Sequence, residues 1–134
     1  MFSYGRIVKN RYIIYLKYIH KGEVMKIAIV GSRSLTMDNF DDFLPAEAIE
    51  LLCGGARGID TCVREYAKRK GLVLTEFFPN YARFGRAAPL KRNLEMIERA
   101  DEVIAFWDGK SRGTAFVIDA CKKNGKPFTV HILE

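Results

Sequence analysis

The sequence predicts an α/β protein with a three-layer, Rossmann-like fold built on a five-stranded parallel sheet. Three observations support this fold: short apolar runs rich in β-branched residues, helical patterns between them, and Gly-rich stretches after several of the runs. Runs and helical patterns alternate from residue 25 onward, which is typical of right-handed βαβ units with both faces of the sheet covered. We therefore expect one domain, at residues 25–134.

The apolar runs predict strands at residues 26–30, 50–53, 72–78, 102–107 and 127–132. A short helix is expected between Thr36, which can cap it, and Pro45, which ends it. A second helix follows residue 58, because apolar residues recur there at the spacing of an amphipathic helix. The last helix begins with Ser111 or Thr114 as its cap and ends at Gly125.

A further helix is expected at residues 89–100, with Leu90, Leu94 and Ile97 on its buried face. Asn93 falls on that face and would need a hydrogen-bond partner. Arg92 points off it and is either a ligand-binding residue or an exposed arginine that pairs along the helix.

Charge and composition exclude several classes of protein. The net charge is +6, but residues 1–24 hold five Lys and Arg against one Glu, whereas the rest of the chain is nearly neutral. A general nucleic-acid-binding surface is therefore disfavoured. No apolar run of about 20 residues predicts a membrane span, and no secretory cleavage pattern is visible. Three cysteines without CxxC spacing indicate reduced thiols of a cytoplasmic protein.

Residues 1–24 are expected to be an extension outside the domain. The stretch Lys21-Gly22-Glu23-Val24 directly precedes Met25 and can be back-translated to a sequence that resembles a ribosome-binding site. Our hypothesis is that translation naturally starts at Met25 and that residues 1–24 are a translated leader.

Three loops after predicted strands carry glycines, hydroxyls and guanidinium groups. Glycine lets backbone N–H groups approach a ligand, and a helix that starts after such a loop offers its positive dipole end to an anion. The carboxyl ends of parallel strands share one edge of a sheet, so these loops are expected to form a crevice for a phosphate-bearing ligand. Its candidate residues are Gly31, Ser32, Arg33, Gly54, Gly55, Ala56, Arg57, Gly58, Asp60, Asp108, Gly109, Ser111, Arg112, Gly113 and Thr114, with Arg92 and Asn93 beside them.

Asp60 has a second interpretation, because a carboxylate in the first turn of a helix can simply be a cap. The loops match neither the dinucleotide fingerprint nor the P-loop. No metal-ligand cluster and no Ser-His-Asp or Cys-His arrangement is visible, so no cofactor or metal is expected.

Four stretches, at residues 27–33, 54–60, 92–96 and 105–114, resemble the motifs of the SLOG superfamily and its YspA-type branch. Relatives in that superfamily are the DNA-processing protein A of natural transformation and the lonely-guy phosphoribohydrolases. The resemblance covers residues 25–134. It implies a sheet order of 3-2-1-4-5 and a nucleotide or nucleotide-derived ligand.

Three functions follow as hypotheses: a nucleotide sensor or ligand-binding domain, a phosphoribohydrolase that cleaves a nucleoside monophosphate, and a single-stranded DNA-binding module. Lonely-guy proteins carry paired glutamates after the Gly-Thr of the last loop, but Ala115, Phe116 and Val117 stand there. Hydrolysis would need a carboxylate from Asp60 or Asp108 instead. The binding domain is therefore favoured, with a small molecule as partner, no membrane association, and homo-oligomerisation left open.

Overall fold

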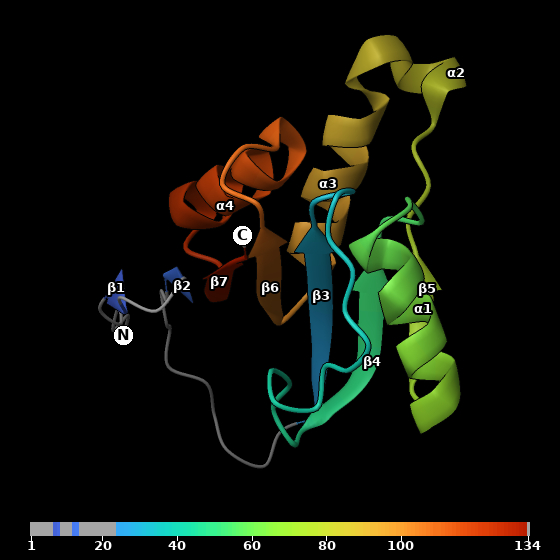
Figure 1. Ribbon diagram of the computed structural model, residues 1–134. Coiled ribbons are helices and arrows are strands. Elements are labelled where there is room, and N and C mark those ends of the chain that lie inside the picture. Colours follow the sequence, from blue (N-terminus) through green and yellow to red (C-terminus); the bar gives the residue numbers. More distant parts are fainter. Residues whose placement is uncertain (1–6, 9–11, 14–23, 134) are drawn as a thin grey trace.

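A parallel sheet of five strands forms the centre of the fold in the computed structural model, which describes residues 7–8, 12–13 and 24–133 (Figure 1). Its spatial order is β5-β4-β3-β6-β7, which in chain order reads 3-2-1-4-5 and confirms the predicted fold class. In chain order the strands are β3 (Met25–Gly31), β4 (Ala48–Cys53), β5 (Val73–Glu76), β6 (Glu102–Trp107) and β7 (Phe128–Ile132).

Two short strands that the sequence did not predict extend the sheet beyond β7. They are β1 (Ile7–Val8) and β2 (Tyr12–Ile13), which pair antiparallel to each other, while β2 pairs antiparallel to β7. Residues 1–6, 9–11 and 14–23 also belong to the hypothetical leader and lie outside the described residues.

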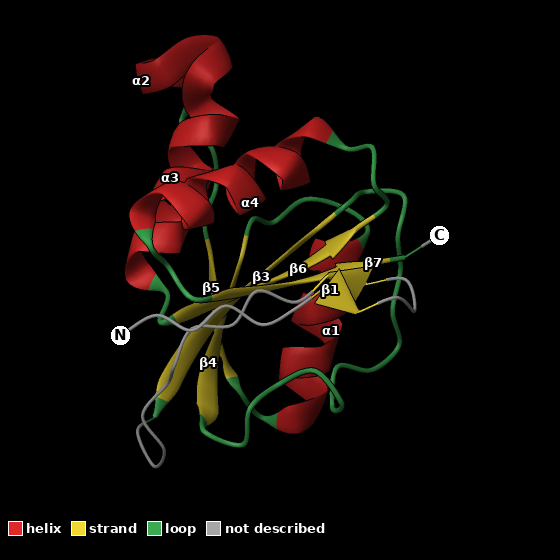
Figure 2. Ribbon diagram, turned by 90° about the vertical axis from the view of Figure 1, so that its left-hand side faces the viewer, coloured by secondary structure: helices red, strands yellow, loops and turns green. Residues whose placement is uncertain are grey.

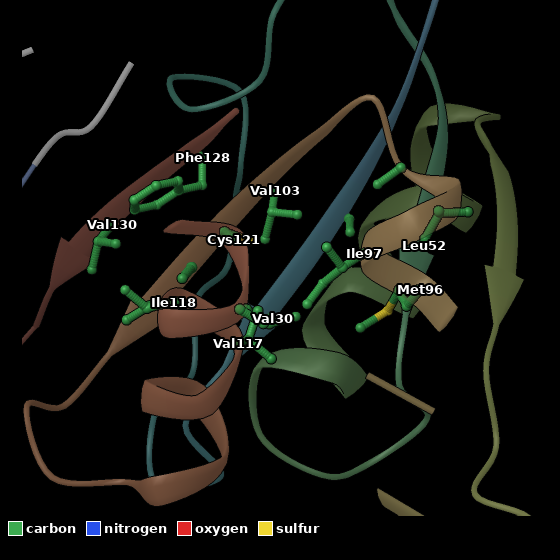
Figure 3. Packing of buried hydrophobic residues seen from close by; sticks show 14 of the residues in the cluster. Val30, Leu52, Met96, Ile97, Val103, Val117, Ile118, Cys121, Phe128 and Val130 are labelled. Atoms are coloured by element: carbon green, nitrogen blue, oxygen red, sulfur yellow. The ribbon is translucent and has the colours of Figure 1, made fainter. Parts of the chain in front are cut away.

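Helices cover both faces of the parallel sheet, as Figure 2 shows. On one face α1 (Ile59–Lys70) packs on a buried cluster that includes Ile27, Ile29 and Leu51. On the other face lie α3 (Ala88–Arg99) and α4 (Arg112–Asn124). Figure 3 shows their apolar side chains against those of the sheet, including Met96, Ile97, Val117 and Ile118 opposite Val30, Leu52 and Val103.

The prediction of a helix between Thr36 and Pro45 is wrong, because this segment forms turns. The Asn39 side chain accepts a hydrogen bond of 2.9 Å from the backbone N–H of Asp41, a local bond that competes with helix formation. Phe40 is completely buried, edge-on to Tyr66 and Phe106. Packing of this aromatic side chain, rather than helical periodicity, therefore fixes the segment.

The predicted buried face of α3 is only partly right. Ile97 is buried, as are Ala88 and Met96, but Leu90 and Leu94 are 41% and 38% exposed. Figure 1 gives the reason: the N-terminal part of α3 extends beyond the ends of the strands, so the sheet does not cover it.

A helical arm precedes α3 and projects from the body of the protein (Figures 1 and 2). It consists of the single turn α2 (Tyr81–Phe84) and the 3₁₀ turn η1 (Gly85–Ala87), neither of which contains a buried residue. In the described part of the chain, no helix combines the length and apolar character needed to cross a membrane.

Candidate functional site

The loops after β3, β4 and β6 surround a cleft of about 300 Å³, which α3 and the start of α4 complete. The cleft lies at the carboxyl ends of the strands, where ligands bind in open α/β sheets. Many residues predicted to bind a ligand line it, namely Gly31, Arg33, Gly54, Ala56, Asp60, Arg92, Asn93, Ser111, Arg112, Gly113 and Thr114.

The other predicted residues lie near the cleft without lining it. Ser32 is buried within the first loop, and Arg57 is exposed on the second. Gly58 borders a separate surface hollow on the far side of that loop. Gly55, Asp108 and Gly109 belong to the loops but not to the wall of the cleft.

The sequence did not predict that one wall of the cleft is apolar. Its residues are Val30, Pro89, Leu90, Met96 and Val117. Each belongs to a strand end or helix whose apolar residues also build the core, so periodicity alone assigns all of them to packing. For Val30, Pro89 and Leu90 the signal is position, since the last apolar residue of a strand and the first turn of a helix border the edge of the sheet where ligands bind. Met96 and Val117 lie further along their helices, and no sequence signal separates them from core residues.

Ser32 and Ser111 join the first loop to the third. Their hydroxyl oxygens lie 2.8 Å apart, and the Ser32 hydroxyl also accepts a hydrogen bond from the backbone N–H of Asp108. Ser111, one of the two predicted caps, occupies the N-cap position of α4, but its side chain forms no capping hydrogen bond. No side chain at the N-cap therefore satisfies the N–H groups of the first turn of α4, which have no acceptor inside the helix.

Asp108 holds the third loop in shape. One carboxylate oxygen accepts hydrogen bonds of 2.8 Å from the backbone N–H groups of Lys110 and Ser111, and the other accepts one from the Ser34 hydroxyl. These bonds, first of all the one from Ser111, lower the pKa of Asp108 to about 2. A carboxylate with so low a pKa is a poor proton acceptor, so Asp108 fits a structural role better than a catalytic one.

Arg92 connects α3 to two loops and is not the exposed arginine of the alternative prediction. Its guanidinium donates hydrogen bonds to the carbonyl oxygens of Gly54 and Phe77, and to the side chain of Asn93. A Cβ atom at Gly54 would lie 3.0 Å from Arg92 and 3.1 Å from the carboxylate of Asp60. Glycine at this position therefore lets both side chains approach the loop.

Asp60 does not cap α1, whose N-cap residue is Gly58. Its carboxylate accepts a 3.0 Å hydrogen bond from the backbone N–H of Ala56, which closes the second loop on itself. Burial raises the pKa of Asp60, although the Ala56 N–H and the charge of Arg92 act in the opposite direction. The cleft thus contains one nearly buried carboxyl group beside a guanidinium.

Arg33 and Arg112 are exposed at the cleft, and among the described residues neither side chain forms a hydrogen bond or an ion pair. With Arg92 they give the cleft three guanidinium groups against the single carboxyl of Asp60. The site is therefore suited to an anion.

Within residues 24–133 and the two short N-terminal strands, no group of three His, Cys, Asp or Glu residues is placed to hold a metal ion. Comparison of the chain with protein-family models, curated proteins and solved structures finds no match.

Proposed function

We propose that the cleft binds a nucleotide or a nucleotide-derived ligand and that the protein acts as a sensor or ligand-binding domain. One observation carries this proposal: the guanidinium groups of Arg33 and Arg112 lie at the cleft and form no hydrogen bond or ion pair with the residues that the structure describes. Beside them starts α4, a helix of 13 residues whose N-cap side chain forms no cap. Guanidinium groups and helix N-terminal N–H groups both favour phosphate.

The apolar wall suits the remainder of such a ligand. Leu90, Met96 and Val117 line the cleft together with its polar residues. A base or ribose can pack on these side chains while the phosphate contacts the arginines. The volume of about 300 Å³ lies at the lower end of the range for small-molecule sites, roughly 300–1,000 Å³.

Isothermal titration calorimetry with AMP, ADP-ribose and NAD tests this proposal, with adenosine as the ligand that lacks phosphate. We expect Arg112→Ala to weaken binding of the phosphate-bearing ligand by about 1.5–3 kcal/mol, or roughly 10- to 150-fold. Arg57→Ala removes an exposed arginine from a neighbouring loop outside the cleft and is the matched control. Equal affinity of adenosine and AMP, or unchanged affinity in Arg112→Ala, would contradict a phosphate site here.

Hydrolysis of a nucleoside monophosphate is the second candidate, and Asp60 is the observation in its favour. A nearly buried carboxyl group with a raised pKa in a cleft is suited to proton transfer or to stabilising positive charge at the sugar. Incubation with nucleoside monophosphates and chromatography of the products tests it. Sustained release of free base that disappears in Asp60→Asn would establish the enzyme, whereas binding without base release supports the sensor.

A further inference from the structure

The arm and the exposed side of α3 carry an apolar patch that nothing in the described chain covers. Among residues 24–133, four of the seven large apolar side chains that are exposed fall in residues 78–94: Phe78, Tyr81, Leu90 and Leu94. Phe78 and Tyr81 are 67% and 61% exposed. This clustering on one projecting element is typical of a protein–protein contact rather than of scattered surface residues.

Phe78 and Leu94 line one hollow of about 290 Å³, which places them side by side although they are far apart in the sequence. The half-buried ring of Phe84 lines the same hollow. A concave apolar surface on a projecting element can receive side chains of a partner.

Charges of both signs surround the hollow. Lys91, Glu95 and Glu98 line it, and none of the three has an ion-pair partner within the described chain. Lys91 instead lies above the ring of Phe84, with its nitrogen 6.0 Å from the ring centre. The basic residue is nearer the start of α3 and the acidic residues nearer its end.

This distribution of charge along α3 is complementary to that of a second, antiparallel copy of α3. If two copies of α3 lie antiparallel about a two-fold axis between Leu94 and Glu95, Lys91 of each copy falls opposite Glu98 of the other. The two Leu94 side chains then lie next to the axis, and each apolar hollow is covered by the other copy. In a two-fold symmetric interface each contact between two different residues occurs twice, so the Lys91–Glu98 pair contributes to the dimer two times.

We propose that the arm and α3 form a two-fold dimer interface with a second copy of this chain, with Lys91 opposite Glu98 of the partner. The interface is distinct from the loops that bear Arg33 and Arg112, so it does not depend on the proposed ligand. Leu90 lies at its edge and also lines the cleft.

Sedimentation velocity of the full chain, between about 1 and 200 μM, measures the association directly. We expect a dimer whose dissociation constant rises with salt, because charge pairs contribute to it. A monomer over the whole range, or open-ended assemblies that grow with concentration, would overturn the two-fold interface.

Charge reversal identifies the contact. In Lys91→Glu and in Glu98→Lys, like charges meet across the axis, so each variant alone is expected to dimerise at least about ten-fold more weakly. A mixture of the two variants restores both opposite-charge pairs and should form a heterodimer with nearly wild-type affinity. Glu65→Lys and Lys68→Glu, at exposed positions of α1, are the matched controls and should dimerise normally.

Two results would contradict this assignment: wild-type dimerisation of both single variants, or failure of the mixture to associate. A further variant, Leu94→Gln, tests the apolar part without changing the charge and should also weaken the dimer. Circular dichroism spectra identical to the wild type would show that each variant is folded.

Discussion

The hydroxyl oxygen of Ser32 lies 2.8 Å from that of Ser111, across 79 residues of sequence. Ser32 is almost completely buried, so this hydrogen bond is sheltered from water. Together with the bond between Asp108 and Ser34, it connects the loop after β3 to the loop before α4. Both loops border the cleft, and we therefore expect them to keep a fixed geometry in the absence of ligand.

Gly58 and Gly113 should respond differently to substitution. Gly58 has a φ of 76°, and a Cβ atom there would lie 2.6 Å from the carbonyl oxygen of Arg33, so Gly58→Ala should lower the free energy of unfolding by about 1–3 kcal/mol. Gly113, however, lies in α4 without a positive φ.

A Cβ atom at Gly113 meets nothing within 4 Å. Gly113→Val should therefore fold nearly normally yet block the cleft, which Gly113 lines. Urea denaturation and calorimetric titration with AMP measure the two effects separately. Wild-type binding in Gly113→Val would remove the start of α4 from the proposed site.

Arg92→Ala should destabilise the protein by about 2–4 kcal/mol, since it removes a half-buried guanidinium that bonds the Gly54 and Phe77 carbonyl oxygens. The change also removes the positive charge near Asp60, so the pKa of Asp60 should rise further. Urea denaturation provides the first readout and NMR titration of the Asp60 carboxyl the second. Arg86→Ala, on the exposed arm, is the control, and equal stabilities of the two variants would argue against this role.

Asp108 should make stability depend on pH in acid solution. Its pKa of about 2 in the folded protein is below the ordinary value of 3.8, so its contribution is present above pH 4 and is lost as the pH falls toward 2. Asp108→Asn cannot titrate and lacks this dependence. The difference in unfolding free energy between wild type and variant should therefore shrink between pH 4 and 2; a constant difference would contradict the assignment.

Glu102 should have the opposite effect near neutral pH. Burial raises its pKa from 4.5 to about 7, so the folded protein binds this proton more tightly than the unfolded chain does. Its contribution is complete below pH 4.5 and declines as the pH rises to 7. Relative to wild type, Glu102→Gln should gain up to about 3 kcal/mol of stability between pH 4.5 and pH 8. Guanidinium denaturation at both values checks this, and no relative gain would show that Glu102 ionises normally.

The strands and long helices could be predicted because local sequence determines them. Glu102–Trp107 is an uninterrupted buried strand with the predicted bounds, and Gly71 and Gly125 end α1 and α4 in the left-handed conformation, as expected of C-caps. The turns around Phe40 could not be predicted, because that side chain is held by Tyr66 and Phe106, which are distant in sequence.

The candidate site was predictable in outline for a related reason. Strand ends that carry glycine and arginine meet at one edge of a parallel sheet, which places Arg33 and Arg112 at one cleft. The partners of individual side chains were not predictable. Arg92 bonds a carbonyl oxygen 38 residues away, and such a bond leaves no mark in the local spacing.

The position of β3 at the centre of the sheet has a consequence for synthesis of the chain. Met25–Gly31 is the first of the five parallel strands in the chain, yet one of its two neighbours is β6, at Glu102–Trp107. On the ribosome, the edge of β3 that pairs with β6 stays open until Glu102–Trp107 has been made. The ribosome exit tunnel covers the newest residues, so the loop after β3 acquires its partner Ser111 only after β6 and the loop that follows it have emerged. Synthesis of the segment that contains β6 and Ser111, rather than emergence of β3 and β4, therefore sets the moment at which the cleft can form.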